Sequence, residues 1–204
     1  RDVERSRGLG DVYKRQSRLD LRGARFTACA IADASFQGAT LADTEWLRCR
    51  GGHAVFASAD ASDAVFSGCD LNNSSWRRAR LATARFRGCK LTGSDFDGIA
   101  CLGWTLEECL LVGALVRGIS FRKTNLHQLD FSDADLTGCD FRDTVFHGGS
   151  LRNATLKNAR FEGADLREAD LGGIDLSAAA RLAGAAISKT QAATLLAELR
   201  ITVI

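Results

Sequence analysis

A large apolar side chain recurs at every fifth position over most of this 204-residue sequence. Of the 32 positions in this register from Leu21 to Leu176, only Gly51, Ala61 and Cys101 lack one. All eleven phenylalanines of the chain lie in the same register. Five residues is the period of neither an α-helix nor a β-strand, so neither element alone explains the pattern. It predicts a backbone that bends once in every five-residue repeat.

The residues around each large side chain indicate how the chain bends. Two positions earlier the side chain is mostly small. Two positions later, in the 31 repeats from Gly23 to Gly173, it is glycine in 13 and Asn or Asp in eight. These three residue types tolerate the positive φ of tight turns. Each repeat is therefore expected to be a short extended piece followed by a turn, with one large and one small side chain pointing inward.

A second period, of twenty residues, predicts that four repeats form one coil. Aromatic residues recur every ten positions from Phe26 to Phe96, and five cysteines recur every twenty. In a four-sided coil, residues twenty apart stack directly and residues ten apart lie on opposite walls. The sequence predicts an all-β solenoid, a quadrilateral β-helix of about eight coils joined by parallel backbone ladders. The cysteines are expected to form one buried, reduced column: Cys29, Cys49, Cys69, Cys89 and Cys109.

The stretches ADLREADL, SDADLTGCDF and NARFEGADL resemble the pentapeptide repeat family, whose consensus is close to A(D/N)LXX. The resemblance covers about residues 17–187 and implies a right-handed quadrilateral β-helix, but no particular function. Residues 1–16 lack the repeat and contain DVYKRQ, which is typical of a read-through adaptor sequence. We interpret residues 1–16 as a non-native leader.

The stretch 98–116 is the main irregularity in the repeats. Trp104 occupies a position meant for a small residue, while Leu110 and Leu115 occupy outward positions. Beyond it, the phenylalanines move to the other pair of walls. We expect a local bulge or kink where the core packing changes walls. The alternative is an exposed apolar patch that binds a partner.

The C-terminal segment 188–204 differs from the repeats, and the register slips by one residue before it. Ser188 and Gln191 form an S-x-x-Q capping box, which predicts a helix over 189–199, and ITVI predicts a strand over 201–204. This end is similar to the tail of Qnr-type (quinolone-resistance) and MfpA-like pentapeptide repeat proteins. There a glycine usually stands at the position of Arg200, so a C-cap is less expected here. The resemblance implies a homodimer formed through the C-terminus by Ala192, Leu195, Leu196, Leu199, Ile201, Val203 and Ile204.

The same resemblance implies a non-enzymatic DNA mimic that binds DNA gyrase or topoisomerase IV and protects it from fluoroquinolones. Residues 101–180 carry 12 acidic and 8 basic side chains, whereas the whole chain carries 25 and 27. The alternative is a scaffold for an unrelated protein partner, because arginines among the aspartates would repel a DNA-binding surface. The expected partner-binding acids are Asp130, Asp133, Asp135, Asp140, Asp143, Asp165, Glu168, Asp170 and Asp175.

Other classes of function find little support in the sequence. No catalytic constellation or cofactor motif is present, and near-balanced charge gives no field for direct binding of nucleic acid or anionic lipid. No apolar run reaches the roughly 18 residues of a membrane span. Seven cysteines without a secretory signal indicate a cytoplasmic location. His127 and His147 are expected to stack on one outer column, but two histidines without a third ligand predict no metal site.

Overall fold

The structure is a computed structural model that describes residues 18–172, 180–197 and 200–201. The described residues divide into two compact units, with the boundary between Leu115 and Val116. Both units are built from the four-sided coils predicted by the period of twenty. The fold is the all-parallel quadrilateral β-helix expected from the repeat pattern.

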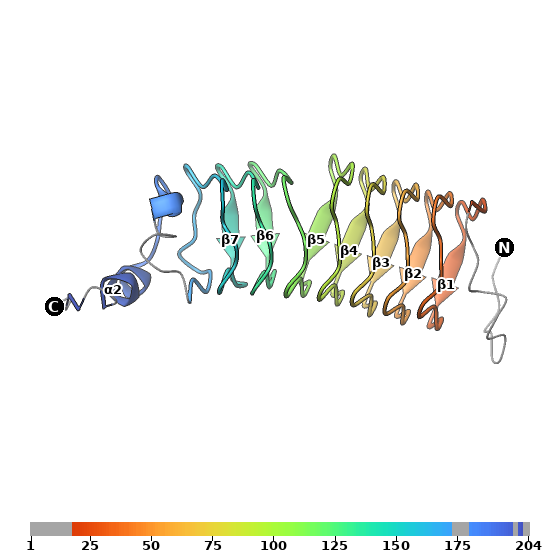
Figure 1. Cartoon of the computed structure of the whole chain (residues 1–204), viewed down its shortest axis with the longest axis horizontal. Coiled ribbons are helices and arrows are strands. Elements are labelled where there is room, and N and C mark those ends of the chain that lie inside the picture. Colours follow the sequence, from red (N-terminus) through yellow and green to blue (C-terminus); the bar gives the residue numbers. More distant parts are fainter. Residues whose placement is uncertain (1–17, 173–179, 198–199, 202–204) are drawn as a thin grey trace. The chain divides into compact units, whose positions relative to one another are not determined.

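In the first unit each coil contributes one short strand, and neighbouring strands pair in parallel and in chain order (Figure 1). The strands are β1 (Arg25–Thr27), β2 (Glu45–Leu47), β3 (Val65–Ser67), β4 (Arg85–Arg87) and β5 (Thr105–Glu107). All paired residues lie twenty positions apart. The other three sides of the coils are joined by isolated parallel bridges at the same spacing, such as Asp20 with Thr40, Ala30 with Arg50 and Ser35 with Val55.

The second unit continues the same spacing within itself. Strands β6 (Asn125–His127) and β7 (Val145–His147) pair in parallel. The last bridge joins Asp165 to Ala186, 21 positions on, which confirms the one-residue slip. A 3₁₀ turn, η2 (Ala180–Leu182), buries Leu182 and precedes helix α2 (Lys189–Ala197). In the part of the chain that the structure describes, neither helix could span a membrane.

The core consists of the large side chains of the five-residue register. Phe66, Phe86 and Phe131 are fully buried, as predicted. Rings twenty residues apart stack, as Phe66 and Phe86 do at 4.7 Å between centroids. Rings ten residues apart meet edge to face, as Phe66 and Trp76 do at 5.3 Å. Both geometries are favourable for aromatic pairs. Leu21 is only half-buried, because no described coil lies before the first one.

Gly51 occupies a large-residue position, yet its neighbours fill the space. The residue is buried, and an added Cβ would lie 2.9 Å from Ile31 Cγ1 and 2.9 Å from Leu71 Cδ2. These two side chains come from the coils before and after. They occupy the volume that a regular repeat would give to its own side chain.

The turns accept more residue types than the sequence suggests. Asp33 and Asn73 have φ of 59° and 55°, as predicted for such residues, but Ala28, Arg48 and Thr83 also have φ between 51° and 56°. Such values are uncommon for a residue with a Cβ, and above all for a β-branched one. The position in the coil therefore determines the backbone conformation, and the side chain adapts to it.

The bulge predicted within 98–116 is not present in the pairing with the preceding coil. Strand β5 pairs with β4 in register. The packing, however, is irregular. Trp104 is too large for its small-residue position and stays half-buried, with its ring edge-on to Phe86 and Phe96 at 6.3 and 5.8 Å. Leu102 is 89% exposed. Isolated bridges keep the twenty-residue spacing at Ala100, Leu110 and Leu115.

The cysteine column is confirmed except at its first member. Cys29 is half-buried, because it lies in the first described coil. The buried thiols donate to backbone carbonyl oxygens 23 residues earlier, as Cys49 Sγ does to Phe26 O at 3.4 Å. These bonds and the burial fit a packing role for cysteine as a small apolar residue. The four buried, free thiols of the column are Cys49, Cys69, Cys89 and Cys109.

Candidate protein-binding surface

The acidic residues predicted to bind a partner occupy two kinds of position, and Asp175 lies outside the described residues. Five of them directly precede a large core residue, and we call them ladder aspartates: Asp130, Asp135, Asp140, Asp165 and Asp170. Three lie two residues after a core residue, and we call them turn acids: Asp133, Asp143 and Glu168.

Each ladder aspartate accepts a hydrogen bond from the backbone N–H two residues later. The distance is 2.9 Å from Ser132 N to Asp130 Oδ1 and 2.8 Å from Gly172 N to Asp170 Oδ1. The same bond recurs at Asp135, Asp140 and Asp165, and in the first unit at Asp20, Asp60, Asp70 and Asp95. A short carboxylate that closes this ring stabilises the turn. The ladder aspartates thus have a structural role that does not depend on any partner.

Two ladder aspartates also form two-bond ion pairs within their own coil. Arg142 donates from Nε to Asp140 Oδ1 at 2.8 Å and from Nη2 to Asp140 Oδ2 at 2.6 Å. Arg167 binds Asp165 in the same way, at 2.8 and 2.5 Å. The hydrogen bond from Arg142 lowers the pKa of Asp140 to about 2. Both carboxylates therefore have their charge matched inside the chain.

Two more ladder aspartates pair with an arginine of the previous coil. In both cases the arginine directly follows a core residue and lies 18 positions before the aspartate. The same spacing occurs in the first unit. The pairs are Arg117 with Asp135 at 2.6 Å, Arg152 with Asp170 at 2.9 Å, and Arg77 with Asp95 at 3.2 Å.

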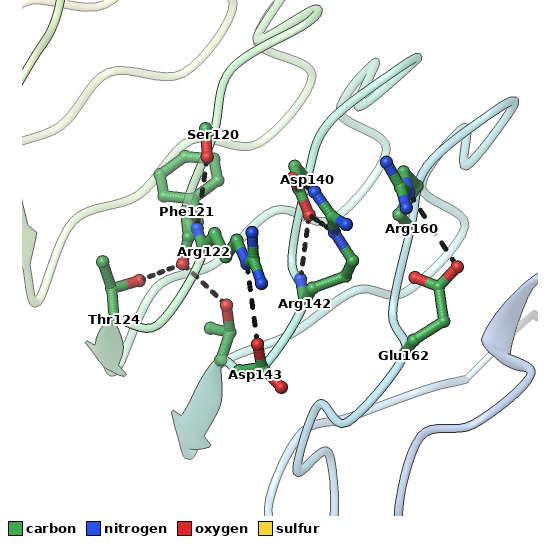
Figure 2. Close-up of polar contacts among 10 residues, drawn as sticks. Ser120, Phe121, Arg122, Thr124, Asp140, Arg142, Asp143, Arg160 and Glu162 are labelled. Atoms are coloured by element: carbon green, nitrogen blue, oxygen red, sulfur yellow. Dashed lines mark hydrogen bonds and ion pairs between the residues drawn. The ribbon is translucent and has the colours of Figure 1, made fainter.

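The edge of the second unit drawn in Figure 2 contains two of the predicted acids but is not acidic. Arg122 Nε lies 3.6 Å from Asp143 Oδ2, and Arg160 Nε lies 3.8 Å from Glu162 Oε1. These pairs and the Asp140–Arg142 pair place charges of opposite sign next to each other along this edge. The labelled side chains of this edge include three basic and three acidic ones: Arg122, Arg142 and Arg160, and Asp140, Asp143 and Glu162.

Three of the predicted acids form no ion pair with another described residue: Asp130, Asp133 and Glu168. Their charge is available to a partner. A count of charges does not reveal this division, because it does not pair them. Three patterns in the sequence reveal it: D-x-R within one repeat, an arginine 18 residues before an aspartate, and an arginine 21 residues before an aspartate, as in the Arg122–Asp143 pair.

The side chain of Gln191 joins the C-terminal helix to the last regular coil. Ser188 N donates to Gln191 Oε1 at 2.6 Å and Gln191 N donates to Ser188 Oγ at 3.2 Å, which confirms the capping box. Gln191 Nε2 also donates to the carbonyl oxygens of Leu166 and Ala169, both at 2.7 Å. Gln191 therefore caps the helix and satisfies two carbonyl groups at the end of the ladder.

The end of the helix corrects the expectation about Arg200. Arg200 N donates to Ala197 O at 2.9 Å and Ile201 N donates to Leu196 O at 3.1 Å. These two bonds form a Schellman C-cap, with Arg200 in the left-handed conformation at φ 58°. The cap therefore forms even though an arginine replaces the usual glycine.

The predicted dimer surface is partly exposed. Ala192, Leu195 and Leu196 are half-buried, and Ile201 is 48% exposed. The side chains of Leu199, Val203 and Ile204, and residues 202–204 of the strand predicted over 201–204, lie outside the described residues. The helix itself is confirmed from Lys189 to Ala197.

Comparison with known proteins agrees with the repeat pattern. Two family models described as pentapeptide repeats match the chain, one over 34–73, 59–98 and 150–179 and the other over 111–155. Comparison with curated protein sequences found no match. A trypsin-treated variant of QnrB1, a plasmid-mediated fluoroquinolone resistance protein, is similar in structure. It has a TM-score of 0.81 and 25% identity, over 92% of this chain and 93% of that one. Full-length QnrB1 has a TM-score of 0.77 and 23% identity, over 88% and 92%.

Proposed function

This chain belongs to the pentapeptide repeat family, and we propose that it is a non-enzymatic, Qnr-like protein that protects a type II topoisomerase from fluoroquinolones. The observation that carries the proposal is the similarity to QnrB1 over nearly the whole of both chains. DNA gyrase or topoisomerase IV is the proposed partner. The proposed location is the cytoplasm, where free thiols stay reduced.

The acids that form no internal ion pair are the proposed contacts for the topoisomerase. Asp130, Asp133 and Glu168 can meet lysine or arginine side chains of a DNA-binding surface without breaking an internal pair. The paired ladder aspartates would first have to lose their arginines, so they should contribute less. Any imitation of DNA by this chain would therefore depend on a small set of carboxylates.

A homodimer through helix α2 is part of the proposal. The half-buried Leu195 and Leu196 and the exposed Ile201 form an apolar surface next to the end of the solenoid. Leu195→Asp would place a charge in the proposed interface, so it should give monomers with an intact solenoid. Light scattering measures the mass, and circular dichroism checks the fold. A monomeric wild-type chain at micromolar concentration would refute the dimer.

The test of the function is a DNA supercoiling assay with purified gyrase, and in parallel with topoisomerase IV, over a range of fluoroquinolone concentrations. We expect the chain to restore activity in the presence of the drug. Asp133→Asn and Glu168→Gln together should weaken this effect. Asp143→Asn is the matched control, because Asp143 has the same turn position and φ of 58° as Asp133 but is paired with Arg122. No restoration at any protein concentration would refute the proposal.

The charge pairing favours a second candidate, a scaffold for an unrelated protein partner. Residues 116–172 carry nine acidic and eight basic side chains, so their net charge is close to zero. A nearly neutral surface of paired charges gives little long-range attraction for a DNA-binding protein. A folded dimer without any effect on either topoisomerase would support the scaffold.

A further inference from the structure

His127 and His147 form a stacked pair on the outer surface of the second unit. They are paired residues of β6 and β7, their ring centroids are 4.5 Å apart, and their planes differ by 11°. His127 is exposed and His147 is half-buried. A stack this open to solvent removes little apolar surface from water, so it gains little stability from burial.

The backbone places the two imidazoles where they can share one metal ion. Imidazole nitrogens bind zinc, nickel and copper ions at about 2.0–2.1 Å, so two nitrogens on one ion lie about 3–4 Å apart. Residues on adjacent parallel strands lie about 4.8 Å apart. Rotation about the side-chain torsions therefore brings one nitrogen from each ring to this distance without any backbone shift. Exposure of His127 leaves room for that rotation.

The charges next to the pair do not oppose a cation. Arg167 follows His147 by twenty residues in the same column, and a free guanidinium there would repel a metal ion. Its two-bond pair with Asp165 matches this charge. The described residues contain no cluster of three or more potential metal-ligating side chains. Water would therefore have to fill the remaining coordination positions.

We propose that His127 and His147 bind one divalent transition-metal ion of the class that prefers imidazole, namely Ni²⁺, Cu²⁺ or Zn²⁺. The site differs from the proposed topoisomerase contacts and does not depend on them.

The test is calorimetric titration of Ni²⁺ into the tag-free full chain at pH 7.5. We expect one ion per chain, and at least a tenfold weaker affinity in His127→Gln and in His147→Gln. His53→Gln is the matched control, because His53 is the third histidine and lies in the first unit. Mg²⁺, which prefers oxygen ligands, should not bind at the same concentrations.

A second measurement separates metal binding from folding. Ni²⁺ should raise the melting temperature of wild type and of His53→Gln but not of the two pair variants, because a ligand stabilises only the state that binds it. Without Ni²⁺ all four proteins should melt at similar temperatures. Absence of binding to wild type, equal binding by the His127→Gln/His147→Gln double variant, or loss of binding in His53→Gln would overturn the proposal.

Discussion

Introducing a large side chain at Gly51, where the five-residue register lacks one, should destabilise the protein. Gly51→Leu would give the coil the large side chain that the register has elsewhere. The Cβ alone would come within 2.9 Å of Ile31 and Leu71, whereas ordinary contacts are 3.4–4 Å. Overpacking of a core costs about 1–3 kcal/mol, while loss of the glycine's backbone freedom returns about 0.5–1 kcal/mol. We expect a net loss of about 1–2 kcal/mol in the free energy of unfolding.

A double-mutant cycle in urea, followed by circular dichroism, tests the cause of this loss. Leu71→Ala alone should cost about 2–5 kcal/mol because it opens a cavity. Combined with Gly51→Leu it should cost less than the sum of the two changes, because the new leucine fills that cavity. If Gly51→Leu stabilises the protein, or if the two changes are additive, then Ile31 and Leu71 do not fill the space at Gly51.

Three further predictions concern the core and one ion pair. Phe86→Ala should lower the free energy of unfolding by about 3–5 kcal/mol, measured in urea, and a loss below about 1 kcal/mol would contradict full burial. A thiol reagent should label half-buried Cys29 before the buried thiols of its column, and equal rates would contradict this. The pKa of Asp140, about 2, lies below the ordinary value of about 3.9, so its pair with Arg142 stabilises the fold above pH 4 and is lost as the pH falls toward 2. The stability difference between wild type and Asp140→Asn should shrink over that range, and a constant difference would contradict the pairing.

The core could be predicted from the sequence because the repeat has few solutions. A five-residue period with a second period of twenty fixes which residues stack, and the pairing of Trp46 with Phe26 and Phe66 follows from counting alone. The exceptions occur where size and register conflict. At Trp104 the backbone keeps its register, because β5 pairs with β4 along its length. The large ring therefore stays half-buried.

The surface was less predictable, because a sum of charges contains no geometry. Asp140 and Asp133 both counted as partner-binding acids, yet one is held by Arg142 and the other forms no ion pair with a described residue. What separates them is whether an arginine stands at a matching position, since the ladder aspartate Asp130 forms no ion pair with a described residue and the turn acid Asp143 pairs with Arg122. The cap at Arg200 was missed for a related reason: the bonds of the Schellman motif can hold an arginine in a conformation for which glycine is preferred.

The twenty-residue register separates the length of a unit from the direction in which its side chains face. Inserting or deleting one whole coil would change the length by about 4.8 Å and leave every remaining column on its own wall. Inserting or deleting five residues would instead turn all that follows by about a quarter revolution and move one wall's side chains onto the next. Evolution and protein engineering can thus change the length of a unit in steps of twenty residues, and the direction in which its side chains face in steps of five.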